Sequence, residues 1–387
     1  MPDPQRRVLL ITRNLPPLRG GMERLNLNMA RAITPEATVS ISGPLGCSAY
    51  LPSNVSQVIE VPHRPLPLFL FRSFVASLRL LRRGRPSHVL AGSGLTAPVA
   101  WVDARATGAR LVVYVHGLDL IAPNRIYQWL WLPFIRRADL VIANSRNTSN
   151  LAAARGVHAR ALVTLHPGTE LPAADDGARR RFRSRIGVGE SPMLLSVGRM
   201  TKRKGLPEFI RSALPVVLAR HPGLHLVVIG DDAIDAVGAA RGSERERILR
   251  AAAKAGVEHA VRLHDPCDDA TLSDAYQAAD IHVFPVREVA GDVEGFGMVA
   301  IEAAAHGLPT VAFDVGGVAD AVVEGRSGSL IPSGDYEGFA AAINGLLQTP
   351  QPSATREECR RAAAAFSWDE FGRRLRELLF ARRKGND

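Results

Sequence analysis

Residues 8–33 read VLLITRNLPPLRGGMERLNLNMARAI and contain a strand, a glycine turn and a helix in succession. Val8–Thr12 is a short apolar run without alternation, which is typical of a strand buried on both faces of a parallel sheet. Met22–Ile33 has the length of a helix, and Gly20 and Gly21 separate it from the strand. A strand that leads through a turn into a helix predicts the first unit of an α/β domain.

The same alternation continues along the chain. Further strands are expected at Val39–Ser42, Val55–Val61, His88–Ala91, Leu111–His116, Leu140–Ala143 and Leu162–Leu165, and further helices at Phe69–Arg83, Arg125–Arg137 and Arg146–Arg155. Residues 167–192 are rich in proline, glycine and charge, which indicates a linker with one basic helix. The alternation then restarts with strands at Met193–Val197, Leu226–Gly230, Val261–Leu263, Ile281–Phe284 and Thr310–Phe313, followed at the end by a helix over Ser367–Arg383.

This pattern predicts two α/β domains, each a doubly wound parallel sheet. The first covers residues 1–170, a linker covers 171–191, and the second domain covers 192–366.

Composition excludes several classes of protein. The chain has 387 residues, of which 46% are hydrophobic and 22% are charged, as in ordinary globular proteins. Its three cysteines (Cys47, Cys267 and Cys359) lie far apart, which argues against a disulfide framework or a Cys-based zinc motif. The apolar run near the N-terminus is too short for a signal peptide, and no run is long enough to span a membrane, so we expect a cytoplasmic protein. The net charge of +10 predicts an anionic partner. Nucleic acid is not expected, because binding motifs and aromatic platforms are missing.

Two loops at the ends of predicted strands in the first domain are candidate sites. The amides of Gly20 and Gly21 and the following helix start could hold a phosphate, although a plain turn stabilised by Glu23 explains them equally well. His116 closes its strand and faces the edge where ligands collect, although a satisfied core histidine is the commoner case. Residues 92–97 imitate a dinucleotide fingerprint but lack its acidic ribose partner.

In the second domain, residues 198–205 read GRMTKRKG. Arg199 offers a bidentate fork and Lys204 a point charge, a combination that suits a diphosphate. A solvated basic loop is the alternative. Only four lysines occur in the chain, so the use of lysine here favours a function.

Residues 293–317 read VEGFGMVAIEAAAHGLPTVAFDVGG and give the strongest local signal. A helix that starts near Gly297, after Phe296 and with Met298 at its beginning, would direct free amides towards a phosphate or sugar. Glu302 lies among small apolar residues, so we expect it to be partly buried and to need partners. It would suit a ribose diol, and Glu294 would reach sugar hydroxyls. The alternative is two unconnected glutamates that flank a helix start.

Residues 63–85 mix leucines and phenylalanines with arginines. Such a helix can lie on an anionic bilayer. The alternative is a core helix of the first domain with arginines at its C-terminal end.

Taken together, these residues resemble the retaining, family-4 type glycosyltransferases of GT-B architecture. The resemblance covers nearly the whole chain and is carried by PPLRGGME, His116-Gly117, LHPGTE, VGRMTKRKG, DAYQAADIHVFPV, and the Glu294-x7-Glu302 segment followed by GLPTVA. It implies two Rossmann-like domains that face each other across a cleft, with the last helix (about 367–387) returning to the first domain.

The resemblance also implies roles for the site residues. Arg199 and Lys204 would contact the diphosphate of a sugar nucleotide, Glu302 its ribose, and Glu294 the transferred sugar. Gly21 and His116 would close over the phosphate and sugar from the first domain.

The expected reaction is transfer of a hexose, with retention, from GDP-mannose or a UDP-sugar to a lipid-linked or envelope glycan, at the inner face of the cell membrane. We expect no cofactor and no metal site: an Asp-x-Asp motif is missing, and Asp292-Val293-Glu294 is the nearest approach to one. A sugar-nucleotide epimerase of the same architecture is the alternative.

Overall fold

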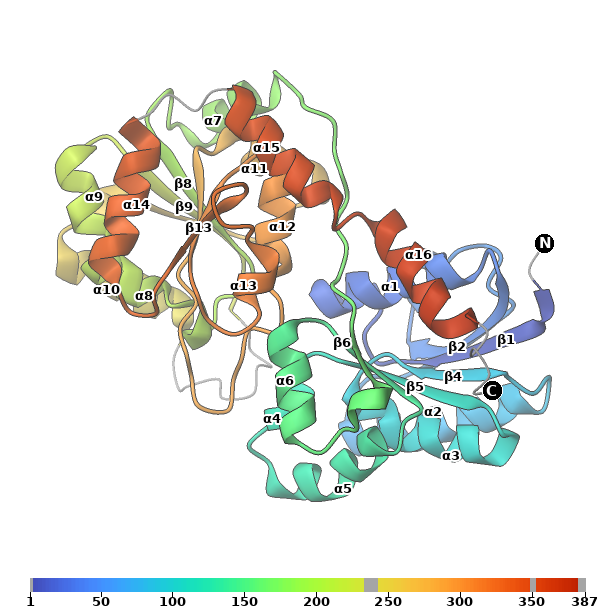
Figure 1. The fold of residues 1–387 in the computed structure, drawn as a ribbon. Coiled ribbons are helices and arrows are strands. Elements are labelled where there is room, and N and C mark those ends of the chain that lie inside the picture. Colours follow the sequence, from blue (N-terminus) through green and yellow to red (C-terminus); the bar gives the residue numbers. More distant parts are fainter. Residues whose placement is uncertain (1–2, 233–242, 349–352, 382–387) are drawn as a thin grey trace. The chain divides into compact units, whose positions relative to one another are not determined.

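The structure is a computed structural model that describes residues 3–232, 243–348 and 353–381. The chain forms two compact units (Figure 1). The first consists of Met1–Gly168 together with Trp368–Asp387, and the second of Thr169–Ser367. The last helix therefore belongs to the first unit, although it is far from the rest of that unit in sequence.

The first unit is built on a parallel sheet of seven strands. Their order in the sheet is β3-β2-β1-β4-β5-β6-β7. The direction in which successive strands are added reverses between β1 and β4, which makes this the switch point of a doubly wound fold. The bounds are β1 Asp3–Ile11, β2 Ala37–Pro44, β3 Gln57–Val61, β4 His88–Ala91, β5 Arg110–Val115, β6 Leu140–Ala143 and β7 Leu162–Thr164.

Helices cover both faces of this sheet. Helices α1 (Gly21–Ile33) and α16 (Trp368–Phe380) pack together on one face, and Figure 1 shows the red α16 beside the blue α1. Helices α2 (Leu66–Leu81), α3 (Ala97–Thr107) and α5 (Arg125–Arg136) contribute to the core on the other face. Shorter helices are α4 Leu118–Ile121, α6 Arg146–Ala154, and the 3-10 turns Cys47–Tyr50, Gly94–Thr96 and Ala159–Ala161.

The second unit contains a parallel sheet of six strands in the order β10-β9-β8-β11-β12-β13. Its switch point lies between β8 and β11. The bounds are β8 Met193–Val197, β9 His225–Ile229, β10 Val261–His264, β11 Ile281–Phe284, β12 Thr310–Phe313 and β13 Gly328–Ile331.

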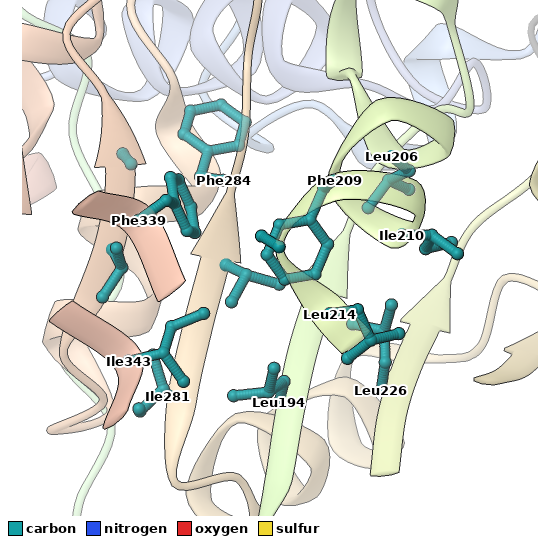
Figure 2. Packing of buried hydrophobic residues seen from close by; sticks show 14 of the residues in the cluster. Leu194, Leu206, Phe209, Ile210, Leu214, Leu226, Ile281, Phe284, Phe339 and Ile343 are labelled. Carbon is teal, nitrogen blue, oxygen red and sulfur yellow. The ribbon is translucent and has the colours of Figure 1, made fainter. Parts of the chain in front are cut away.

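The core on one face of this sheet is made by strand residues and by helices α8 and α14, as Figure 2 shows for Leu194, Phe209 and Phe339. Helices α7 and α11 pack on the opposite face. The helix bounds are α7 Ala178–Ile186, α8 Leu206–Ser212, α9 Leu214–Arg220, α10 Glu244–Ala255, α11 Asp269–Ala278, α12 Met298–Ala305, α13 Val318–Ala321, α14 Tyr336–Gln348 and α15 Ser353–Ala364, with 3-10 turns at Lys202–Lys204 (η4) and Glu258–Ala260 (η5).

The predicted fold class, two doubly wound parallel sheets, agrees with these strand orders. The segment expected to be a linker contains α7, which packs on α11 through the buried Phe182. One strand, β13, was not predicted, because the edge strand GSLI is short and begins with glycine. The last two residues predicted for the final helix, 382 and 383, lie outside the described residues.

None of the helices that the structure describes is long and apolar enough to span a membrane.

Candidate functional site

Two loops meet at the carboxyl edge of the second unit's switch point. One follows β8 and contains η4, and the other follows β11 and leads to α12. The backbone N–H of Arg287 in the second loop donates to the carbonyl of Arg203 in the first (2.9 Å). A Cβ on Gly205 would lie 2.1 Å from the carbonyl oxygen of Pro285, and the φ of Gly205 is +68°. Only glycine fits where the loops pass so closely.

Lys204 and Glu294, both predicted site residues, form an ion pair across these loops. The Nζ of Lys204 lies 2.9 Å from the Oε2 of Glu294, and the two side chains are only 14% and 13% exposed. The ammonium also lies 4.4 Å from the ring centre of Phe284, at the end of β11. The pair therefore has a defined position at the edge of the sheet.

Arg203 completes this cluster and was missed by sequence reasoning. Its guanidinium pairs with Asp292 and also contacts Glu294 through Nε (3.3 Å). The planar guanidinium of Arg203 therefore forms ion pairs with two carboxylates of the loop between β11 and α12. The nearest approach to a metal-binding motif, Asp292-Val293-Glu294, is therefore paired with cationic side chains.

The charges within the cluster shift the pKa values of its members. Burial raises the pKa of Glu294, but Lys204 and Arg203 outweigh burial and lower it to about 2. Burial lowers the pKa of Lys204; Arg203 and Arg199 act in the same direction, and Glu294 opposes them. Burial also lowers the pKa of Arg203, but its two carboxylate partners reverse the shift and raise it. Glu294 is therefore an ionised acceptor at neutral pH.

Arg199 adds a third cation to this edge. Its side chain is exposed and forms no ion pair with any residue that the structure describes, although its charge reaches Lys204. Among the described residues, ion pairs join Arg203 and Lys204 to two carboxylates, Asp292 and Glu294, so the three cations outnumber the carboxylates paired with them. The excess positive charge favours an anionic ligand.

The start of α12 is anchored by glycines. The N–H of Gly317 donates to the carbonyl of Glu294 (2.9 Å). Gly297, the N-cap of α12, has a φ of +95°, and a Cβ there would lie 2.9 Å from the ring of Phe284. The motif GG at positions 316–317 was the sequence signal for this support.

The remaining predicted residues of the second unit have different surroundings. The side chain of Phe296 is buried in the core, near the ring of Phe366, so only its backbone could meet a ligand. Met298 begins α12 and is half-buried. Glu302 is also half-buried, and its Oε2 accepts a hydrogen bond from the hydroxyl of Tyr276 (3.1 Å).

In the first unit, the glycine turn after β1 is partly filled by a carboxylate. The Oε1 of the buried Glu23 accepts a hydrogen bond from Asn14 (2.7 Å), and a Cβ on Gly20 would lie 2.5 Å from the other oxygen. The alternative of a turn stabilised by Glu23 therefore describes Gly20 well. Gly21, which begins α1, is exposed.

His116 lies directly after β5 and is buried. Its Nε2 donates to the carbonyl of Gly92 in the loop after β4 (3.0 Å), and its backbone N–H donates to the Oδ2 of Asp119 (2.9 Å). A Cβ on Gly92 would meet Thr12 and Asn26, so His116 approaches the switch point between β1 and β4. These two hydrogen bonds agree with the alternative of a buried histidine whose polar groups have partners. The residue lies at the carboxyl edge of the sheet, where the sequence placed it.

Within the described ranges, no group of three or more His, Cys, Asp or Glu side chains is arranged to hold a metal ion.

Two family models match the chain. The model described as Glycosyltransferase Family 4 matches residues 19–171, and the model described as Glycosyl transferases group 1 matches residues 178–366.

Related sequences extend over most of the chain. A "GDP-mannose-dependent alpha-(1-6)-phosphatidylinositol monomannoside mannosyltransferase" of Mycolicibacterium smegmatis is 33% identical over 97% of this chain and 99% of its own. A "D-inositol 3-phosphate glycosyltransferase" of Acidothermus cellulolyticus is 34% identical over 81% of this chain and 73% of its own.

Solved structures show the same fold at low identity. HepE of Anabaena, in complex with UDP and glucose, superimposes with a TM-score of 0.79 at 19% identity, over 97% of this chain and 99% of that chain. WaaG, a glycosyltransferase involved in lipopolysaccharide biosynthesis, has a TM-score of 0.71 at 17% identity, over 97% and 100% of the two chains. The predicted GT-B fold class is confirmed.

Proposed function

Because the chain belongs to the glycosyl transferases of group 1, we propose that it moves a hexose from a nucleoside-diphosphate sugar to a hydroxyl of a lipid-linked or envelope glycan. We further propose that the anomeric configuration is retained. A lipid-linked acceptor would place the enzyme at the inner face of the cell membrane.

The observation that carries this proposal is the cation-rich cluster at the β8/β11 edge. Departure of a nucleoside diphosphate builds negative charge on its distal phosphate. Arg199 and Lys204 supply donors for that charge, and preorganised donors of this kind are worth roughly 3–4 kcal/mol each. We expect the reaction to proceed in the presence of EDTA for this reason.

Lys204 can bind a phosphate without giving up its partner. An ammonium has three donors, and Glu294 accepts one of them. The other two remain for phosphate oxygens. Glu294, ionised because of its neighbours, would accept from hydroxyls of the transferred sugar and would not act as a proton donor at neutral pH.

Other predicted residues would complete the donor site. The amides that follow Gly297 at the start of α12 suit the diphosphate, and Glu302, held by Tyr276, suits the ribose diol. From the first unit, Gly20, Gly21 and His116 would contact the phosphate and sugar.

GDP-mannose is the donor that we propose first, because the M. smegmatis relative is named for it. A UDP-sugar is the second choice. The epimerase alternative gains no support, since the relatives quoted above are all named as transferases.

The test is product analysis with a labelled donor. Purified protein is incubated with GDP-[14C]mannose or UDP-[14C]glucose, bacterial lipid extract and EDTA. We expect label in the lipid fraction, formed about 100-fold or more slowly with Lys204→Ala. Label that appears only in a different free sugar nucleotide would assign an epimerase, and a strict need for a divalent cation would contradict metal independence. Thermal shifts with GDP-, UDP- and dTDP-sugars would identify the base by mass action.

A further inference from the structure

The first unit gathers exposed hydrophobic side chains on three neighbouring helices. Twelve large hydrophobic residues are conspicuously exposed among those that the structure describes, and seven of them belong to α2, α3 and α5. These seven are Leu66, Phe71, Leu78, Val102, Ile126, Trp129 and Leu130. Gathered apolar exposure of this kind marks an interaction surface.

The most exposed members form a stripe along α5. Ile126, Trp129 and Leu130 are 67%, 78% and 41% exposed, and their spacing places them on one side of the helix. The opposite side is fixed to the unit: the indole of Trp131 donates to the carbonyl of Leu95 (2.9 Å), and Leu132 and Ile135 are buried. The packing of this opposite side therefore fixes the orientation of α5 and keeps the side chains of the stripe exposed.

The three helices share one outer surface. Leu80 of α2 and the buried hydrophobic side chains of α3 and α5 belong to one core cluster, on one face of the sheet, and α3 contacts both of the other helices. Figure 1 shows them on the same side of β4 and β5. Their outward sides therefore point away from the same sheet face, and we call them the helical face.

Charge on the helical face has a single sign. Residues 66–137 contain ten arginines and no lysine, and their only acidic residues are Asp103 and Asp119. Asp103 is fully buried, and Asp119 accepts the backbone N–H of His116. Exposed arginines lie on α2 and α3 and at both ends of α5: Arg72, Arg79, Arg105, Arg125, Arg136 and Arg137.

We propose that the helical face rests on an anionic phospholipid surface, with Trp129 as its main anchor. Tryptophan prefers the membrane interface, arginines beside it attract anionic headgroups, and α2, α3 and α5 present no exposed carboxylate to repel them. The contact predicted for residues 63–85 thus becomes one part of a larger surface. The core alternative describes Phe69 and Leu80, which are buried, while the exposed Phe71 lies on the side of α2 that is free for the proposed contact.

The test is vesicle flotation of the full chain, which needs no sugar nucleotide. Vesicles of phosphatidylcholine alone are compared with vesicles that contain 30% phosphatidylglycerol, at low and high salt. We expect binding only to the anionic vesicles, and loss of binding at high salt. Ile126→Ser, Trp129→Ser and Leu130→Ser combined should weaken binding at least tenfold. Arg72→Gln with Arg79→Gln should weaken it about fivefold per arginine.

Matched controls come from the second unit. Val216→Ser with Leu249→Ser removes side chains that are 46% and 50% exposed, and Arg220→Gln removes an exposed arginine of α9. These variants should bind vesicles as the parent does. Quenching of tryptophan fluorescence by brominated lipid should fall in Trp129→Phe, which identifies the anchor directly.

Three outcomes would overturn the proposal. They are no binding to anionic vesicles at low salt, equal binding to neutral vesicles, and a dimer of the parent chain that the triple serine variant abolishes while vesicle binding is absent. The last would assign the helical face to a second copy. Because the assay measures flotation alone, its failure leaves the proposed sugar transfer untouched, and a thermal shift with GDP-mannose in the triple variant checks that separately.

Discussion

Burial raises the pKa of two carboxyl groups, one in each unit, but their net pKa shifts go in opposite directions. Asp103 on α3 is fully buried, and burial raises its pKa to about 6 although Ser77 lies beside it and opposes the shift. Glu294 is only 13% exposed, yet its pKa is lowered to about 2. The difference comes from Lys204 and Arg203, which lie within ion-pair distance of Glu294.

The comparison separates a structural carboxyl from a candidate functional one. Burying an ionised group is costly unless cations surround it. In the second unit, two cations offset that cost at the carboxyl edge of the sheet, where ligands of this fold collect. Asp103 lies on α3 beside Ser77, and no cation lowers its pKa. A retained charge of low exposure, together with its position in the fold, therefore makes Glu294 the candidate functional carboxyl.

The largest expected effect comes from removing the cation that pairs with Glu294. Lys204→Ala should lower kcat/KM for sugar transfer about 100-fold or more, because one preorganised donor to the leaving diphosphate is lost. Steady-state kinetics with the donor that the product analysis selects would measure this. Lys202→Ala is the control, since Lys202 is exposed two residues away. Near-normal turnover of Lys204→Ala would remove Lys204 from the site.

Asp103→Asn should act in the other direction and stabilise the first unit. The pKa of Asp103 is higher in the folded protein than its ordinary value of 3.8, so folding is penalised increasingly as pH rises from about 4 to 6, and the penalty is complete above 6. We expect a gain on the order of 2 kcal/mol at pH 8 and almost none near pH 3. Calorimetry across this range would measure it.

Asp176→Asn, at an exposed aspartate, should show no such pH dependence. A gain for Asp103→Asn that is equal at both ends of the pH range would mean that Asp103 does not ionise on unfolding as described.

The smallest effect should follow from Arg203→Gln. Glu294 then keeps only one of its cations, so its pKa rises towards the usual range. Even at the ordinary value of 4.5, only about a quarter of the carboxyls would be protonated at pH 5. The loss should therefore be measured near pH 4, where kcat/KM should fall up to about fourfold relative to pH 7.5, beyond any change in the parent. A pH–rate profile would show the displaced acid limb.

Arg203→Lys restores the positive charge and should restore the profile, even where loss of the bidentate guanidinium fork lowers the overall rate. An unchanged profile in Arg203→Gln would mean that Lys204 alone keeps Glu294 ionised.

Most strands of the two sheets could be predicted from the sequence, because strands buried on both faces appear as short uninterrupted apolar runs. Runs such as Leu140–Ala143 and Ile281–Phe284 coincide with β6 and β11. The positions of Arg199, Lys204, Glu294 and Glu302 could also be named, since glycines and charges at strand ends are local features.

Contacts between residues far apart in the chain could not be predicted from the sequence. Arg203 is separated from Asp292 by 89 positions, and nothing within TKRKG distinguishes it from a solvated arginine. The same holds for α5: Ile126 and Trp129 are as apolar as its buried residues, so the sequence does not reveal which side of the helix is exposed. Only the packing of Trp131 and Leu132 against the unit decides this.

The return of α16 to the first unit has a consequence for how the protein is made. Phe371, Leu375 and Leu379 fill the core beside α1, and Arg110 donates to the carbonyl of Leu378. When the first 168 residues have been translated, the first unit therefore still lacks α16. The apolar side chains that α16 covers stay uncovered until some two hundred more residues have been translated. Completion of the first unit therefore depends on the translation of residues 368–380, and a nonsense mutation anywhere between residues 169 and 368 would also leave the first unit without α16.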